Sequence, residues 1–136
     1  MPALPEIKDP FDPIAFVVAL VSAPFLVAGA GFWLLFIPVV AAIAGLPAYL
    51  ICGTPVLLWM VGRFEPRFAS FAVAGFLTDL AACLMCLAAE KQGLIAGYQG
   101  YSVILGFGLI FAPAWTGTFA VAYRLLYRPA RLAGYL

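Results

Sequence analysis

The sequence predicts an all-α integral membrane protein with four transmembrane helices, and three observations lead to this fold class. Of its 136 residues, 66% are hydrophobic and only 10% are charged, and the mean hydropathy is +1.11. Because a soluble domain carries about 25% charged residues, this composition excludes a soluble globular fold. The charges are also unevenly distributed, and residues 13–62 contain none. One helix needs about 20 residues to cross a bilayer, so this run holds two helices and a turn.

The remaining charges separate two further apolar segments, which brings the number of spans to four. We expect helices at about residues 14–32, 38–61, 68–90 and 101–124. The first turn falls near 31–38, so that Pro38 lies in the first turn of the second helix, as Pro13 opens the first. Glycine and proline at 53–55 predict a kink or a short unwound stretch there. A re-entrant segment at 38–61 is the alternative to a full second span.

The positive charges predict the orientation of a single polytopic domain that covers residues 1–136. With four spans, one side of the membrane carries Lys8, Arg63, Arg67, Arg124, Arg128 and Arg131, and the other carries Lys91. The positive-inside rule then places both termini in the cytoplasm. Residues 1–13 form a Pro-rich cytoplasmic leader, whose acidic character disfavours a cleaved signal peptide, and residues 125–136 form a short basic cytoplasmic tail.

Several residue types are missing, and their absence excludes whole classes of function. The chain has no histidine, which removes the commonest metal ligand and near-neutral proton carrier. No paired carboxylates, nucleophile set or phosphate-binding loop can be assembled, so we expect no catalytic residues, no cofactor, no metal site and no enzymatic activity. A net charge of +1 argues against nucleic acid. The expected partners are the lipid bilayer and either other membrane-protein subunits or a homo-oligomer.

Asp79 is the most informative residue, because it lies at the middle of the third predicted span. An isolated charge at that depth costs about 2.5–3.5 kcal/mol even on insertion scales. We therefore expect a protonated, hydrogen-bonded carboxyl, with Tyr49, Thr54, Thr116 or Thr118 as its partner. Asp79 is then either a coupling site for protons or cations, a contact with a charge on a partner, or a polar pin between helices.

Small residues recur at every fourth position of the last two predicted spans. The predicted helix-packing residues are Ser70, Ala74, Gly75, Thr78 and Ala82 on the third span, and Gly108, Ala112, Thr116 and Ala120 on the fourth. Small-xxx-small spacing lets helix backbones approach closely in lipid. We expect the third and fourth helices to pack through these faces, either within one chain or between two copies.

Two further groups of residues have both a functional and a structural interpretation. Cys83 and Cys86 form a C-x-x-C pair that is typical of thiol–disulfide or soft-metal chemistry, although buried cysteines also serve as small apolar residues. Arg124, Arg128 and Arg131 suit anionic lipid headgroups, although topology alone would explain them.

These features favour a protein that acts through interaction. The first hypothesis is an accessory or assembly subunit of a larger membrane protein complex. The alternative is a small homodimeric proton-coupled transporter in which Asp79 exchanges protons for a cationic or apolar substrate, with Tyr49 and Trp115 as aromatic walls. The ratio of two Lys to five Arg, the lack of Asn and the abundance of Ala, Gly and Pro are typical of a GC-rich bacterial genome. Because the spans are helices, the expected location is the bacterial inner membrane.

Overall fold

The structure, a computed structural model of the chain, describes residues 11–31, 37–95 and 98–127, and these ranges are helical apart from short connections. The elements are α1 (Pro13–Ala30), α2 (Ile37–Ala48), the π-helical turn η1 (Tyr49–Gly53), α3 (Thr54–Val61), α4 (Phe68–Lys91) and α5 (Tyr98–Leu126). Four stretches are long and apolar enough to cross a membrane, namely Pro13–Ala30, Val39–Val61, Phe68–Lys91 and Leu105–Leu126. The predicted number and approximate positions of the helices are therefore confirmed.

The boundaries differ from the prediction by a few residues. Helix α1 ends at Ala30 and α5 begins at Tyr98, where the sequence had suggested 32 and 101. The predicted first turn lies between α1 and α2, and its residues 32–36 are outside the described ranges. Residues 1–10 of the predicted leader and 128–136 of the predicted tail are also outside them.

Helix α1 begins at a side-chain cap that also joins it to the end of α5. The Oδ1 atom of Asp12 accepts hydrogen bonds from the backbone N–H groups of Ile14 and Ala15, each at 3.0 Å. Pro13 occupies the first turn, where its missing N–H removes no helical bond. The backbone N–H of Asp12 donates to the hydroxyl of Tyr123 at 3.3 Å. This cap fixes the start of α1 against the last turns of α5.

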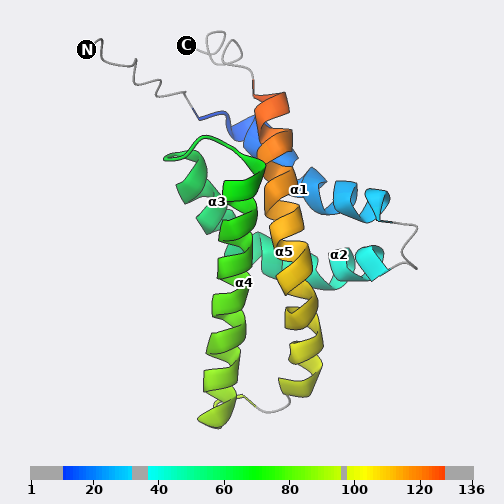
Figure 1. Cartoon of the computed structure of the whole chain (residues 1–136), viewed down its shortest axis with the longest axis vertical. Helices are drawn as coiled ribbons and strands as arrows, with labels where there is room; N and C mark the ends of the chain where they lie inside the picture. Colours follow the sequence, from blue (N-terminus) through cyan, green and yellow to red (C-terminus); the bar gives the residue numbers. More distant parts are fainter. Residues whose placement is uncertain (1–10, 32–36, 96–97, 128–136) are drawn as a thin grey trace.

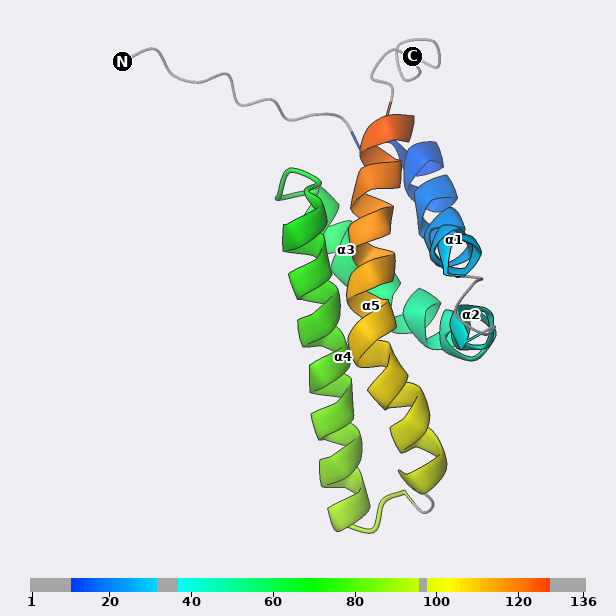
Figure 2. The same cartoon turned by 45° about the vertical axis from the view of Figure 1, so that its right-hand side comes forward.

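The two long helices α4 and α5 form an antiparallel pair, and the first three helices pack against one part of it (Figure 1). The start of α1, the connection at residues 62–67 and the end of α5 lie at one end of the molecule in both views (Figure 2). The α4–α5 connection lies at the opposite end. Helices α1 to α3 leave the half of the α4–α5 hairpin nearest this connection uncovered (Figure 1).

The second apolar stretch is bent at η1, near the predicted break. Helix α2 lies crosswise to α5 part of the way along it, and α3 then runs back toward the end where α1 begins (Figures 1 and 2). Pro47 lies in α2 and Pro55 in the first turn of α3, and each lacks the N–H that a continuous α-helix would use. The chain forms a π-helical turn at this point instead of an unwound segment. The stretch Val39–Val61 is nevertheless long and apolar enough to cross a membrane, as predicted for residues 38–61.

Glycines set the close approach of α4 to α5. A Cβ atom built on Gly75 would lie 2.7 Å from the carbonyl oxygen of Ala112 and would overlap the side chain of Thr116. Near the end of α5, a Cβ on Gly117 would lie 2.6 Å from the ring of Phe68. The two backbones therefore pack at a distance that leaves no room for side chains at these positions.

A column of aromatic residues on α5 contacts α1, α4 and η1. It consists of Phe107, Phe111, Trp115, Phe119 and Tyr123, which follow one another at every fourth position. The ring of Phe16 on α1 meets Phe119 edge-on with centroids 5.1 Å apart, and the ring of Phe71 on α4 stacks on Phe119 at 6.1 Å. Phe16, Phe71 and Phe119 are all buried. Side-chain contact to one column thus joins α1 and α4 to α5.

Replacing Gly75 by alanine should lower the stability of the protein, because the new methyl group has no space between α4 and α5. We expect a loss of about 1–3 kcal/mol in the free energy of unfolding, as for other overpacked cores. Gly106 on α5 is the matched control, since a Cβ built there meets nothing within 4 Å. Gly106→Ala should leave stability unchanged or raise it by up to about 1 kcal/mol. Thermal unfolding in detergent micelles measures both, and equal effects of the two variants would contradict the packing described.

Candidate functional site

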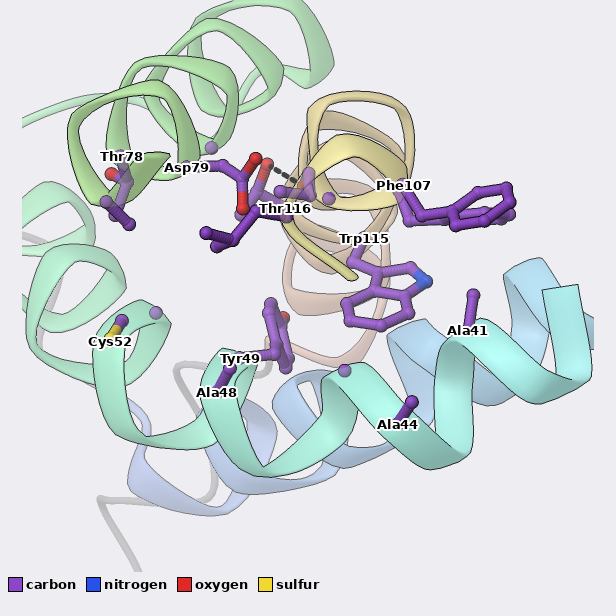
Figure 3. A pocket seen from close by; sticks show the side chains of 18 of the residues that line it. Ala41, Ala44, Ala48, Tyr49, Cys52, Thr78, Asp79, Phe107, Trp115 and Thr116 are labelled. Atoms are coloured by element: carbon purple, nitrogen blue, oxygen red, sulfur yellow. Dashed lines mark hydrogen bonds between the residues drawn. The ribbon is translucent and has the colours of Figure 1, made fainter. Parts of the chain in front are cut away.

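A cavity of about 360 Å³ lies between the α2–η1–α3 arm and the α4–α5 pair. Its volume falls within the range of about 300–1,000 Å³ that is typical of small-molecule sites. Alanine, glycine, valine and aromatic side chains make up most of its wall, and Asp79 is the one charged residue among the described residues that line it. Figure 3 shows Asp79 from α4, Trp115 from α5 and Tyr49 from η1 around this space. The structure thus brings the predicted carboxylate and both predicted aromatic walls to one cavity.

The carboxylate of Asp79 is held against the backbone of α5. A Cβ built on Gly108 would lie 2.7 Å from Asp79 Cγ, so only glycine leaves space for the carboxylate there. The thiol of Cys83, one turn further along α4, donates to Asp79 Oδ2 at 3.8 Å. The same sulfur lies 3.8 Å from the carbonyl oxygen of Leu105. Asp79 is therefore positioned by a small residue and a thiol, and its side chain is only partly buried.

The predicted hydrogen-bond partners of Asp79 are wrong. The hydroxyl of Thr116 donates to the carbonyl oxygen of Ala112 on its own helix at 2.8 Å, a local bond that threonine readily forms in a helix. The hydroxyl of Tyr49 has no partner among the described residues, and neither Thr54 nor Thr118 bonds to Asp79 within them. The carboxylate lies against Gly108 and the Cys83 thiol instead, so a matching position along the predicted spans was not sufficient to identify a partner.

Tyr49 and Trp115 form an edge-to-face aromatic pair across the cavity. Their ring centroids are 5.3 Å apart and their planes lie at 78°. Both side chains are buried, with 6% and 4% of their surface exposed. Glycines give them room, since a Cβ on Gly45 would lie 2.8 Å from the Trp115 ring and one on Gly53 would lie 3.2 Å from the Tyr49 ring. The hydroxyl of Tyr49 and the Nε1 atom of Trp115 are buried without a hydrogen-bond partner in the described part of the chain.

The predicted small-residue columns divide between packing and cavity. Gly75 packs directly on α5 and also lines the cavity, as Ala74, Thr78 and Ala82 do. On α5, the predicted packing residues that line the cavity are Gly108, Ala112 and Thr116, of which all three also contact or face α4. Ala120 is fully buried in the core, and Ser70 is exposed. One edge of the α4 surface therefore makes the helix contact and the other edge forms a wall of the site.

The remaining predicted site residues are the two thiols of α4 and the arginines at the end of the chain. Cys83 and Cys86 are free thiols, and the described residues contain no group of three or more Cys, Asp or Glu side chains that could hold a metal ion. Arg124 is exposed, and its guanidinium lies 3.9 Å from Glu65 in the connection between α3 and α4. Arg128 and Arg131 are outside the described residues.

The aromatic column of α5, whose members Phe107, Phe111 and Trp115 line the cavity, was not predicted from the sequence. Its signal is present in the sequence as an aromatic residue at every fourth position from Phe107 to Tyr123, a period that places side chains along one face of a helix. No comparable sequence pattern predicts the cavity, because its formation depends on the bend at η1. No family model, curated protein or solved structure matches this chain.

Replacing Tyr49 by phenylalanine should stabilise the empty protein, because it removes a buried hydroxyl that has no hydrogen-bond partner among the described residues. An unsatisfied buried polar group costs about 1–3 kcal/mol, so we expect a gain of about 1 kcal/mol in the free energy of unfolding. Tyr123→Phe is the matched control, since its hydroxyl accepts from the backbone of Asp12. That variant should lose about 1 kcal/mol. The free energy of unfolding, measured in detergent, gives the sign of each change. Destabilisation by Tyr49→Phe would indicate that the hydroxyl of Tyr49 is hydrogen-bonded.

Proposed function

We propose that this protein is a small homodimeric proton-coupled transporter that exchanges protons for a cationic or apolar substrate at Asp79. The observation that carries the proposal is that this carboxylate, at the middle of α4, lines a cavity of small-molecule size instead of pairing with a basic side chain. Placing a carboxyl group in an apolar membrane-spanning segment costs free energy. A functional role is therefore the default interpretation of such a residue.

The surroundings of Asp79 suit reversible exchange. The Cys83 thiol on its own helix contacts it, and two further titratable residues, Tyr49 and Cys52 on η1, line the same cavity. From α5, the described residues that face it offer backbone and small side chains without charge. In the proposed cycle, a bound cation displaces the carboxyl proton to the aqueous phase on the side to which the site is open. When the cation leaves, Asp79 takes up a proton from the other side.

The proposed setting is the bacterial inner membrane, with both termini in the cytoplasm. Four helices of sufficient length and apolar character support membrane insertion. The excess of Lys and Arg on the side of residues 62–67 and the chain ends supports the orientation.

A second candidate function is that of an accessory subunit in a larger membrane complex. It is favoured by the half of the α4–α5 hairpin that α1 to α3 leave uncovered (Figure 1). That surface is apolar, with Met85 72% exposed and Leu84 and Val103 58% and 59% exposed. In the transporter proposal, a second copy of the chain would bind to the same surface. Identifying the partner bound there therefore distinguishes between the two proposed functions.

Asp79→Asn should abolish proton-driven uptake while leaving the protein assembled. The test uses vesicles of phosphatidylethanolamine and phosphatidylglycerol that are acidic inside, with radiolabelled trimethylphenylammonium outside. A quaternary ion has no neutral base form that could cross the bilayer, so its accumulation reports exchange. We expect the variant to lose uptake about tenfold or more, which corresponds to about 1.4 kcal/mol or more. Glu90→Gln, the same change at an exposed position of α4, is the control and should behave as the unaltered protein. Uptake that persists in Asp79→Asn would refute the exchange role.

Purification in mild detergent followed by native mass determination should give a dimer of this chain. The uncovered half of the α4–α5 hairpin supplies the surface for the second copy. A companion chain in fixed stoichiometry would instead establish the accessory-subunit function. Asp79→Asn should leave the mass unchanged if Asp79 serves exchange, whereas loss of the partner in this variant would assign Asp79 to assembly.

A further inference from the structure

The connection between α3 and α4 carries positive charge that its own carboxylate only partly neutralises. It contains Arg63, Glu65 and Arg67, and Arg124 near the end of α5 lies beside it (Figure 1). The Oε2 atom of Glu65 accepts two hydrogen bonds from Arg67, at 2.7 and 3.1 Å. The Oε1 atom of Glu65 lies 3.9 Å from the guanidinium of Arg124. One carboxylate thus faces two arginines, and the third arginine adds a further positive charge.

Arg63 is the arginine of this connection that has no carboxylate within ion-pair distance among the described residues. Its guanidinium lies over the ring of Trp59 instead, 4.8 Å from the ring centroid. A cation–π contact of this kind needs none of the N–H donors of the guanidinium. These donors suit the oxygens of a phosphate group, to which arginine can form two parallel hydrogen bonds. Arg63 is therefore held by an aromatic ring while its donors stay available to an anion.

Exposed aromatic side chains accompany this arginine. Trp59 and Phe64 are each about half exposed, and their ring centroids lie 5.7 Å apart. The connection joins two stretches that are long and apolar enough to cross a membrane, Val39–Val61 and Phe68–Lys91. Tryptophan at the end of such a stretch is typical of the boundary between membrane and water. An anion bound to Arg63 would therefore lie directly beside an apolar surface.

The combination of charge and apolar surface selects the chemistry of the partner. A free inorganic anion would satisfy the guanidinium and leave the exposed rings in water. A zwitterionic phospholipid would cover the rings but would bring an ammonium group toward a surface with an excess of positive charge. An anionic phospholipid supplies a phosphate for the arginine and acyl chains for the rings, without that repulsion.

We propose that Arg63, Trp59 and Phe64 form a binding site for an anionic phospholipid. The phosphate binds the guanidinium of Arg63, and the upper part of an acyl chain packs against the exposed rings of Trp59 and Phe64. The sequence pattern had indicated lipid headgroups for Arg124, Arg128 and Arg131, whereas this site is centred on an arginine of the α3–α4 connection. It does not involve Asp79, so it is compatible with either of the two proposed functions.

Trp59 itself can report the bound lipid. In the variant Trp33→Phe, the remaining tryptophans are Trp59, which is half exposed, and Trp115, which is buried. This variant is reconstituted in vesicles of phosphatidylcholine that carries bromine in the upper part of one acyl chain, because bromine quenches tryptophan on contact. Raising the share of unbrominated phosphatidylglycerol restores the fluorescence of Trp59 to the extent that this lipid replaces phosphatidylcholine at the site. The same vesicles with Trp59→Phe added give the contribution of Trp115, which is subtracted.

We expect Trp59 to select phosphatidylglycerol over phosphatidylcholine about fivefold, the effect of one arginine near an anionic lipid. The preference should decrease as the salt concentration rises, because the charges are exposed. Arg63→Gln should abolish it. Arg67→Gln is the matched control, since it removes the same charge from the same connection and leaves Arg124 beside Glu65. This control should keep most of the preference. Unchanged quenching of Arg63→Gln in brominated phosphatidylcholine alone shows that this variant is folded.

Four results would overturn the proposal. Equal recovery with unbrominated phosphatidylglycerol and unbrominated phosphatidylcholine would mean ordinary contact with the bilayer. Equal losses in Arg63→Gln and Arg67→Gln would mean that the general charge of the surface, and not Arg63, selects the lipid. Failure of brominated phosphatidylcholine to quench Trp59 would show that protein, such as a second copy of the chain, covers this surface. Finally, millimolar glycerol phosphate should not reverse the recovery, and reversal would show that the site binds a free phosphate ester instead of a lipid.

Discussion

Helix α5 is the element on which the remaining packing depends, because it presents two different surfaces to its neighbours. Its small residues, with Gly108 and Ala112 among them, accept α4 at close backbone distance. Its aromatic column contacts α1 through Phe119 and η1 through Trp115. A row of residues four apart winds slowly around a helix, so one column meets different neighbours along its length. Helices α1, α2 and α4 and the turn η1 therefore all pack against the same 29 residues, whereas α3 packs on η1 and α4.

The candidate site arises where these two surfaces of α5 meet. Gly108 makes room for the carboxylate of Asp79 on one side, and Trp115 packs over Gly45 on the other. The cavity lies between these contacts, and two residues that line it, Tyr49 and Trp115, carry buried donors without a partner among the described residues. Such groups lower stability in the empty protein and are typical of sites at which structure serves function. Asp79, Tyr49 and Trp115 all line one cavity of small-molecule size, which supports its interpretation as a binding site.

The sequence was sufficient for the parts of the fold that depend on local chemistry. The spacing of charges located the four apolar helices, Pro13 marked the start of α1, and residues 53–55 marked the break in the second stretch. The course of α2 across α5 was not predictable, because it results from aromatic packing between Tyr49 and Trp115, residues 66 positions apart. For the same reason Asp79, Tyr49 and Trp115 could be selected as polar and aromatic candidates, whereas their shared cavity and the role of Cys83 beside Asp79 could not.

The π-helical turn has a consequence for how this sequence can change during evolution. Such a turn holds one residue more than an α-helical turn, which makes it equivalent to a single-residue insertion. Deleting one residue from Tyr49–Gly53 would restore the α-helical register and rotate α3 by about 100° relative to α2. Leu57, which is fully buried, would then turn away from the core. Length variation in this turn is therefore constrained more tightly than composition, and gaps in aligned homologues should be rarer here than in the connection at residues 62–67.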